Sequence, residues 1–418
     1  MKRFYPIIFI FLVTCLIFFK VFTKGLFPIP GDLLVSFYFP WFSGGWEGYD
    51  SFTYHKELLN ADSIRQIYPW KEFAMAELKG GRFPNWNPYT FSGQPLAANL
   101  QSGVYYPFNI FYFITNAKNA WILLVVLQPL LAGIFMYLAL RSFRLSKTPS
   151  LFGAVAFMFS SYVITWIENV NIIHSYIWLP LCIWTINCFK EYKKMRYVLI
   201  LILSLTISIL SGHPQTAIYV FIAVLIYWAY IFWGKNFASK LINLIIIFVS
   251  SLILSAIQLI PTAAFYKVSP ISLPFSREVF DRSIMPYKSL VTFFASDFFG
   301  HPAADNFWFN TYGDFTPYIG VVPLIFALWI IFKKWQHNFI KFASLVSAFF
   351  ILSAIHSPVT FLIKTLQIPL LNSTTPSRFI SISLFFLTIL AAFGFEDFIN
   401  NFQEKKYWRL FIRFTVFI

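Results

Sequence analysis

Charge and cysteine are both scarce in this chain. Charged residues make up 12% of it, whereas a soluble domain usually holds about 25%. The three cysteines lie in or beside apolar runs and include no Cys-x-x-Cys pair, so the sequence predicts neither a zinc site nor a disulfide framework. Walker, Gly-x-Gly-x-x-Gly and His-Glu-x-x-His motifs are also missing, which argues against an ATPase, a dehydrogenase and a zinc protease.

Apolar residues are abundant instead, at 58% of the chain, and they recur in long runs separated by short basic clusters. About 20 apolar residues in a helix cross a hydrocarbon core of roughly 30 Å. We therefore expect an all-α polytopic membrane protein with about ten spans and the start of an eleventh near Leu410, within which the sequence is truncated. The expected spans are 5–24, 119–140, 150–167, 174–189, 197–211, 214–233, 241–261, 317–332, 342–356 and 378–395.

The basic residues are distributed unequally between the two sides of these spans. Segments on the side of the N-terminus hold 18 of the 32 Lys and Arg residues and 4 of the 17 Asp and Glu residues. Short cytoplasmic loops are rich in Lys and Arg, so we place the N-terminus in the cytoplasm. The same rule explains the net charge of +15 without a nucleic-acid partner.

This alternation predicts five parts of the chain. They are a first span (1–24), a first outer loop (25–118), spans two to seven (119–261), a second outer loop (262–316), and spans eight to ten with the C-terminal residues (317–418). Short apolar segments within the outer loops are typical of helices that lie in the membrane interface.

The first outer loop concentrates the acidic residues of the chain. It holds two copies of one pattern, an Asp followed by a Tyr, a Pro and a Trp, at 32–41 and 62–70. A membrane protein that gathers its carboxylates in one outer loop is expected to carry out chemistry there.

Three stretches of this loop carry a family resemblance. They are Asp-Ser-Ile-Arg-Gln-Ile-Tyr-Pro-Trp at 62–70, Gly-Gly-Arg-Phe-Pro-Asn-Trp-Asn-Pro-Tyr at 80–89, and Phe-Ser-Gly-Gln-Pro-Leu-Ala-Ala-Asn-Leu-Gln-Ser at 91–102. Gly-His-Pro-Gln at 212–215 and Ser-Arg-Phe at 377–379 add to them. Together they resemble the YfhO-like bacterial membrane proteins.

That family is similar to the GT-C superfamily of glycosyltransferases. The resemblance implies an enzyme of the bacterial cytoplasmic membrane whose active site lies on the outer face. Such an enzyme moves a sugar from a polyprenyl-phosphate donor to a cell-surface glycan, lipid or protein acceptor. In GT-C enzymes an acidic residue of the first outer loop acts as the base or positions the acceptor.

The chemistry of this transfer selects the candidate site residues. A carboxylate must accept a proton from the acceptor hydroxyl, and we expect Asp62 to do so, with Asp32 as the second candidate. Cationic and hydrogen-bonding groups must stabilise the phosphate leaving group. Arg378 fits this role because its planar guanidinium can bind two oxygens, and His213 and Arg65 are the other candidates.

Aromatic and polar residues could bind the sugar. The candidates are Trp70, Trp86, Asn87, Tyr89, Gln101, His174 and Glu168. Trp and Tyr are also common in the aromatic belts of membrane proteins, so an interfacial role is the alternative for the aromatic candidates. We expect no cofactor, and the acidic residues match no strong motif for a divalent metal.

A transporter or a flippase of lipid-linked glycans is the main alternative function. Transporters usually show internal repeats and ionisable groups inside broken helices, and neither is evident in this sequence.

Overall fold

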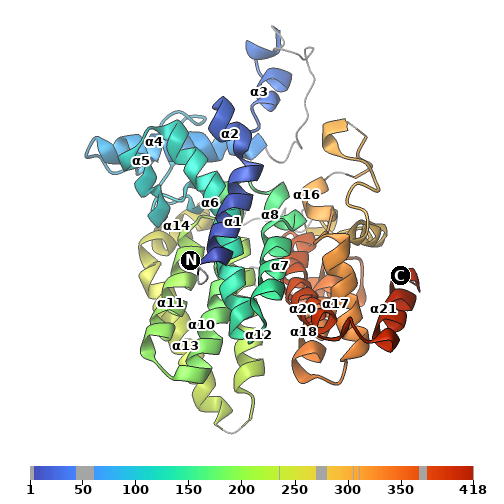
Figure 1. Ribbon diagram of the computed structural model, residues 1–418. Coiled ribbons are helices and arrows are strands. Elements are labelled where there is room, and N and C mark those ends of the chain that lie inside the picture. Colours follow the sequence, from blue (N-terminus) through green and yellow to red (C-terminus); the bar gives the residue numbers. More distant parts are fainter. Residues whose placement is uncertain are drawn as a thin grey trace.

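The computed structural model describes residues 4–43, 61–234, 236–269, 280–304, 306–309, 311–366 and 374–417. Their regular structure is almost all helical, apart from a two-stranded antiparallel pairing of β1 (Trp86–Asn87) with β2 (Gln94–Pro95) (Figure 1). The α-helices are α1 (Tyr5–Ile17), α2 (Phe19–Lys24), α3 (Asp32–Phe37), α4 (Tyr68–Lys79), α5 (Phe111–Ile114), α6 (Ala117–Ser142), α7 (Lys147–Met158), α8 (Ser161–Thr165), α9 (Val170–Tyr176), α10 (Trp178–Tyr192), α11 (Met195–Leu210), α12 (Pro214–Phe232), α13 (Phe237–Leu254), α14 (Ala256–Val268), α16 (Tyr312–Phe315), α17 (Val321–Lys333), α18 (Asn338–Ala354), α19 (Pro358–Leu366), α20 (Ile380–Asn401) and α21 (Lys405–Phe417). Short 3-10 helices are η1 (Trp41–Ser43), η4 (Leu100–Ser102), η5 (Pro107–Ile110), η7 (Tyr287–Phe293), η8 (Pro302–Ala304) and η9 (Pro376–Phe379), whereas η3 (Ser63–Ile67) is a π-helical turn.

Five helical segments in the described residues are long and apolar enough to cross a membrane. They are Ala117–Ser142, Val170–Tyr192, Pro214–Phe232, Phe237–Leu254 and Pro376–Asn401. Four shorter apolar helices, α1, α11, α17 and α18, pack beside them. The chain is thus a helical membrane protein, and the total of about ten spans stays a prediction.

The C-terminal helix differs from the expected start of an eleventh span. It begins at Lys405 rather than near Leu410, and it includes Arg409 and Arg413. One side of it packs on α17, where the ring of Phe411 lies 5.2 Å from the ring of Trp329. Basic residues along this helix make it less apolar than the five candidate spans, as expected for a helix at a membrane surface.

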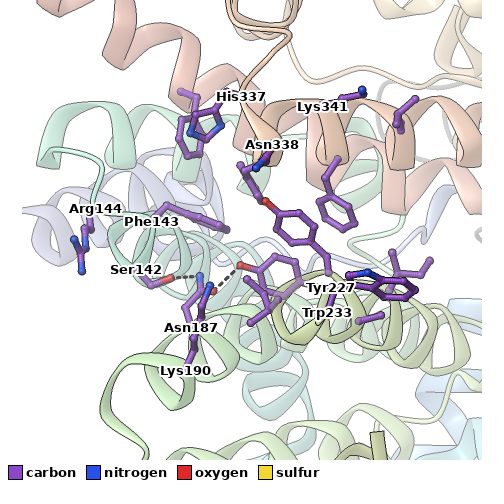
Figure 2. Close-up of a pocket in the computed structure, with 18 of the residues that line it drawn as sticks. Ser142, Phe143, Arg144, Asn187, Lys190, Tyr227, Trp233, His337, Asn338 and Lys341 are labelled. Carbon is purple, nitrogen blue, oxygen red and sulfur yellow. Dashed lines mark hydrogen bonds between the residues drawn. The ribbon is translucent and has the colours of Figure 1, made fainter. Parts of the chain in front are cut away.

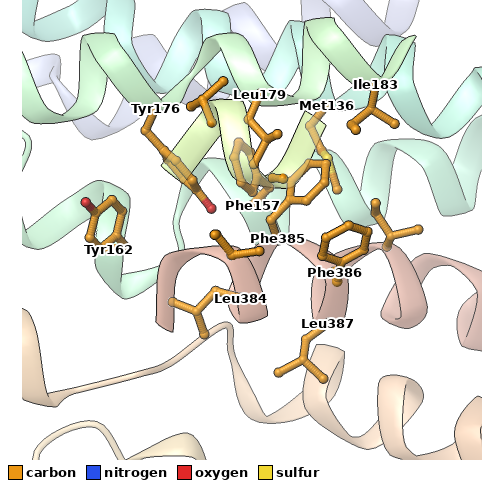
Figure 3. Close-up of a cluster of buried hydrophobic side chains, with 14 of the residues drawn as sticks. Met136, Phe157, Tyr162, Tyr176, Leu179, Ile183, Leu384, Phe385, Phe386 and Leu387 are labelled. Carbon is orange, nitrogen blue, oxygen red and sulfur yellow. The ribbon is translucent and has the colours of Figure 1, made fainter. Parts of the chain in front are cut away.

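The core of the membrane domain surrounds α20. This helix is buried along nearly its whole length and packs against α7, α17 and α18. Figure 3 shows its residue Phe385 against Phe157 of α7, and the two ring centres lie 5.8 Å apart. Lipid tails are as apolar as leucine, so close packing of this kind, rather than the hydrophobic effect, holds helices together in a bilayer.

The first outer loop packs onto one end of the helical bundle through a second hydrophobic cluster. Trp70 and Met75 of α4 belong to this cluster, together with Trp121 of α6. Backbone groups of the loop are also held by the bundle, because Gln258 of α14 donates to the carbonyl of Ala97 at 2.9 Å. In Figure 1, α3, α4 and α5 lie at the end opposite the turn between α12 and α13. The part of the loop that contains α4 and the segment around Ala97 therefore packs on the bundle and positions its polar residues there.

Candidate functional site

Four of the residues that the sequence proposes for the site line one cavity: Asp62, Gln101, His213 and Arg378. They come from four separate segments, namely the residue before η3, then η4, the turn before α12, and η9. The cavity has a volume of about 90 Å³, which is enough for several water molecules or a small anionic group. The other residues that line it are Ile67, Trp166, Asn169, Asn171 and Ile172.

The turn that carries His213 depends on the residues around it. Gly212 has φ +103°, which side chains rarely adopt, and a Cβ there would come within 2.9 Å of a backbone oxygen of η4. Pro214 then begins α12, where its missing N–H leaves no hydrogen bond unmade. Gln215 connects this helix start to the segment before η9, because its Nε2 donates to the carbonyl of Thr375 at 2.9 Å.

Arg378 is a buried cation with a carboxylate partner. Its Nε donates to Oδ1 of Asp314 at 2.9 Å, and its Nη2 lies 3.4 Å from Oδ2. The side chains of Arg378 and Asp314 are only 13% and 3% exposed. The guanidinium also lies 4.5 Å from the centre of the Trp166 ring, a cation–π contact. Asp314 therefore uses Nε and Nη2 and leaves Nη1 for another partner.

That partner is His213, whose Nε2 lies 3.4 Å from Nη1 of Arg378. A guanidinium can only donate, so Nε2 accepts in this arrangement, and Nδ1 donates to Oγ1 of Thr216 at 2.8 Å. Burial and the charge of Arg378 hold the pKa of His213 well below its usual range, so its ring is neutral. The ring is thus a neutral hydrogen-bonding group at the cavity wall.

Asp62 lines the same cavity and comes from the first outer loop. Burial of its carboxyl group raises the pKa of Asp62, although the charges of Arg65 and Arg378 act in the opposite direction. Gln66 donates to Oδ1 of Asp62 at 3.3 Å. Arg65 itself packs over the ring of Tyr38 at 5.5 Å and does not line the cavity. A carboxylate with a raised pKa is better matched to accepting a proton near neutral pH.

Several other candidates lie outside this cavity. Asp32 begins α3 and is not one of the lining residues. Trp70 is buried in the cluster beneath α4, so it is a core residue and cannot stack on a sugar. Trp86 and Tyr89 lie in the loop around β1 and β2, with 53% and 81% of their surfaces exposed.

The remaining polar candidates are buried within the protein. In His174, Nε2 lies 2.9 Å from the carbonyl of Leu124, so Nε2 donates and Nδ1 accepts from the Tyr106 hydroxyl at 2.6 Å. Both ring nitrogens are thus used, and His174 links the outer loop to α6 instead of binding a ligand. The side chain of Asn87 is bonded to Thr90 and to the backbone of Tyr89 within its own loop. Glu168 is buried next to the cavity-lining Asn169 but does not line the cavity.

The sequence analysis did not select several residues that build the cavity. Asp314 pairs with Arg378, and Trp166, Asn169 and Asn171 are further residues that line the cavity. A usable signal existed for Asn169 and Asn171, because two Asn residues flank a Val between Glu168 and His174, in an otherwise apolar region. No local signal distinguished Asp314 from the other acidic residues of the second outer loop. Among the described residues, no three His, Cys, Asp or Glu residues are close enough together to hold a metal ion.

The chain matches the model of one protein family, described as the bacterial membrane protein YfhO, over residues 57–418. It therefore belongs to that family. No curated protein and no solved structure matches the chain.

Proposed function

We propose that this member of the YfhO family is a membrane glycosyltransferase of the bacterial cytoplasmic membrane. It moves a sugar from a polyprenyl-phosphate donor to a cell-surface glycan, lipid or protein acceptor on the outer face. The observation that supports this most is the single cavity lined by Asp62, Gln101, His213 and Arg378. A carboxylate and a cation that meet in one cavity supply the base and the anion-binding group of such a transfer.

Asp62 acts as the general base in this proposal. The acceptor hydroxyl oxygen attacks the anomeric carbon of the sugar and forms the new C–O bond. The bond between that carbon and the donor phosphate oxygen breaks, and polyprenyl phosphate leaves with the electron pair. Asp62 takes the hydroxyl proton, and the raised pKa of its carboxyl group favours this step. Gln101, which lines the same cavity, orients a sugar hydroxyl.

Arg378 and His213 bind the phosphate in this proposal. Nη1 of Arg378 faces His213 and is not used by Asp314, so it can donate to a phosphate oxygen. The neutral ring of His213 donates from Nε2 in its other tautomer, in which Nδ1 accepts from the N–H of Thr216, 3.3 Å away. Asp314 is then a positioning residue that fixes the plane of the guanidinium.

The exposed aromatic residues Trp86 and Tyr89 are proposed to contact the acceptor. Their rings lie on the outer-loop surface, where an extended glycan could stack on them. Arg65 lies outside the cavity, and its proposed contribution is its effect on the charge state of Asp62.

The test is the Asp62→Asn variant in membrane vesicles supplied with a radiolabelled polyprenyl-phosphate sugar. We expect transfer to fall by about 10²–10⁴-fold, because an amide cannot accept the proton. Asp281→Asn is the matched control, since it removes an exposed carboxylate that pairs with Lys364 at 2.8 Å. Wild-type transfer in Asp62→Asn would refute the role of Asp62. Movement of intact lipid-linked glycan across the bilayer, without sugar transfer, would support the flippase instead.

A further inference from the structure

A second and larger cavity lies at the other ends of the same helices. Its volume is about 1190 Å³, above the usual range of about 300–1,000 Å³ for small-molecule sites. Figure 2 shows it between the C-terminal ends of α6, α10 and α12 and the N-terminal part of α18. The 19 residues of α12 separate His213 from this end, a length of about 28 Å at 1.5 Å per residue. The lining residues of the second cavity on α12 begin at Ile226, so the two cavities lie near opposite ends of this helix.

The lining of this cavity carries a net positive charge. Arg144 and Lys190 line it from the ends of α6 and α10, and Lys341 lines it from α18 on the facing side (Figure 2). Glu191 is the acidic residue in the lining, and it lies 3.5 Å from Arg144. The lysines come from the ends of helices on the Lys- and Arg-rich side of the chain, which the positive-inside rule assigns to the cytoplasm. The cavity thus presents a net positive charge at the level of the inner-leaflet headgroups.

Part of the cavity lining is apolar and aromatic. Tyr230 of α12 and Phe342 of α18 stack with their ring centres 4.0 Å apart. Trp233, directly after α12, and Leu345 of α18 line the cavity and are 78% and 53% exposed. This part of the lining is therefore apolar where acyl chains would reach it.

The lining also contains three side chains joined by hydrogen bonds, of which Tyr227 is buried and Asn187 and Ser142 are partly buried. Tyr227 donates to Oδ1 of Asn187 at 2.5 Å, and Nδ2 of Asn187 donates to Oγ of Ser142 at 2.8 Å. Figure 2 shows this chain of hydrogen bonds at the cavity wall. It joins α6, α10 and α12, so the wall is fixed before any ligand enters.

We propose that this cavity binds a lipid with an anionic phosphate headgroup from the cytoplasmic leaflet. Lys190 and Lys341 attract the headgroup from the two facing sides of the cavity, and an acyl chain lies along Tyr230, Phe342 and Leu345. A basic pocket between membrane helices on the cytoplasmic side is suited to an anionic lipid headgroup. The apolar wall selects a lipid over a soluble phosphate, which would leave that wall exposed to water. This proposal does not depend on the glycosyltransferase proposal.

The experiment is a lipid titration of the purified full chain in detergent, followed by native mass spectrometry. Phosphatidylglycerol is compared with phosphatidylcholine of the same acyl chains, and with glycerol phosphate as the free headgroup. We expect phosphatidylglycerol to bind preferentially and the Lys190→Gln/Lys341→Gln variant to bind it about thirtyfold more weakly. Lys193→Gln/Lys194→Gln is the control, because it removes two cytoplasmic charges that do not line the cavity.

A second variant tests the apolar part without a change of charge. Ala229 lines the cavity, and Ala229→Trp fills part of it, so we expect this variant to lose bound lipid as well. This variant also tests the proposal if the double lysine variant fails to fold.

The proposal is overturned if phosphatidylcholine binds equally well, if glycerol phosphate competes fully, or if the lysine and tryptophan variants both retain wild-type binding. A change from dimer to monomer in the variants, without a change in bound lipid, would assign the cavity to contact with a second copy and also overturn the proposal.

Discussion

At the residue scale, the buried pair of Arg378 and Asp314 dominates the electrostatics of the cavity that Asp62 and Arg378 line. Both side chains are removed from water, and each compensates the charge of the other. Removing one partner of such a pair leaves an uncompensated buried charge and typically destabilises a protein by about 3–5 kcal/mol.

We therefore expect Asp314→Ala to lower stability by about that amount in unfolding by sodium dodecyl sulfate. The matched control is Asp281→Ala, whose partner Lys364 is exposed, and for which we expect about 1 kcal/mol or less. Equal effects of the two variants would show that Arg378 does not depend on its carboxylate. The double variant Arg378→Met/Asp314→Leu should recover part of the loss, because it leaves no unpaired charge.

Lys71 of α4 is a second buried cation, and it lies near Gly103, as does the cavity-lining Asn171. The side chain is 1% exposed, and its Nζ has no hydrogen-bond partner among the described residues. It packs against Gly103, where a Cβ would come within 2.6 Å of Nζ. Burial lowers the pKa of Lys71 from 10.5 to about 7.

The pH dependence of stability follows from this difference. Between pH 7 and pH 10.5 the unfolded chain holds the Lys71 proton more tightly than the folded protein does, so stability rises with pH across this window. Below pH 7 the full penalty of the buried charge is present. We expect Lys71→Met to raise the unfolding temperature at pH 7 and to abolish the increase of stability with pH. Thermal unfolding in detergent from pH 6 to pH 10 measures it, with the exposed Lys79→Met of the same helix as control. If the unfolding temperature of Lys71→Met depends on pH as strongly as that of the wild type, another group causes the pH dependence.

At the scale of elements, glycines set how closely the central helices approach. Gly394 of α20 lies against the backbone of α17, where a Cβ would overlap the carbonyl oxygen of Phe326. Gly153 of α7 lies similarly close to Ala392, on another side of α20. Small residues at such contacts allow membrane helices to pack backbone to backbone.

We expect Gly394→Ala to destabilise the protein by about 1–3 kcal/mol, the usual cost of overpacking, although alanine favours helices. The control is Gly80→Ala at the end of α4, where the nearest atoms are the flexible side-chain end of Arg82 at 3.3 Å. Unfolding curves of the two variants under the same conditions measure the difference. A Gly394→Ala protein as stable as the control variant would show that α17 and α20 can move apart at little cost.

At the scale of the whole molecule, the two cavities mark the two ends of the helical bundle. Asp62 and Arg378 line one cavity, and Lys190 and Lys341 line the other. The positive-inside rule assigns the second end to the cytoplasm.

Cysteine labelling tests this orientation in intact cells. In a background without Cys15, Cys182 and Cys188, we expect Ser92→Cys to react with a membrane-impermeant maleimide from outside. Lys194→Cys should react only after the membrane is permeabilised. Both positions are exposed in the structure, so a lack of labelling reflects the side of the membrane and not burial. The reverse pattern would place the Asp62 cavity in the cytoplasm and refute the proposed donor and acceptor.

The sequence alone determined the class of the protein. Long apolar runs and the uneven distribution of Lys and Arg are local properties, and they suffice to predict a helical membrane protein and a cytoplasmic side. The turn at Gly212, His213 and Pro214 could also be predicted, because three adjacent residues encode it. Asp62 and Arg378 could be selected as candidates because charged groups are rare in such a chain.

Only the tertiary structure decided which candidates meet. Asp62 and Arg378 are separated by more than 300 residues, and their approach depends on how the outer loop packs over α9, α12 and α20. Packing also buried Trp70 and His174 and gave Arg378 a carboxylate partner in Asp314. A residue type indicates which contacts a side chain can make, whereas burial and pairing depend on neighbours that are distant in the chain. For that reason the chemistry of the site could be proposed from the sequence, whereas the set of residues that line the site could not.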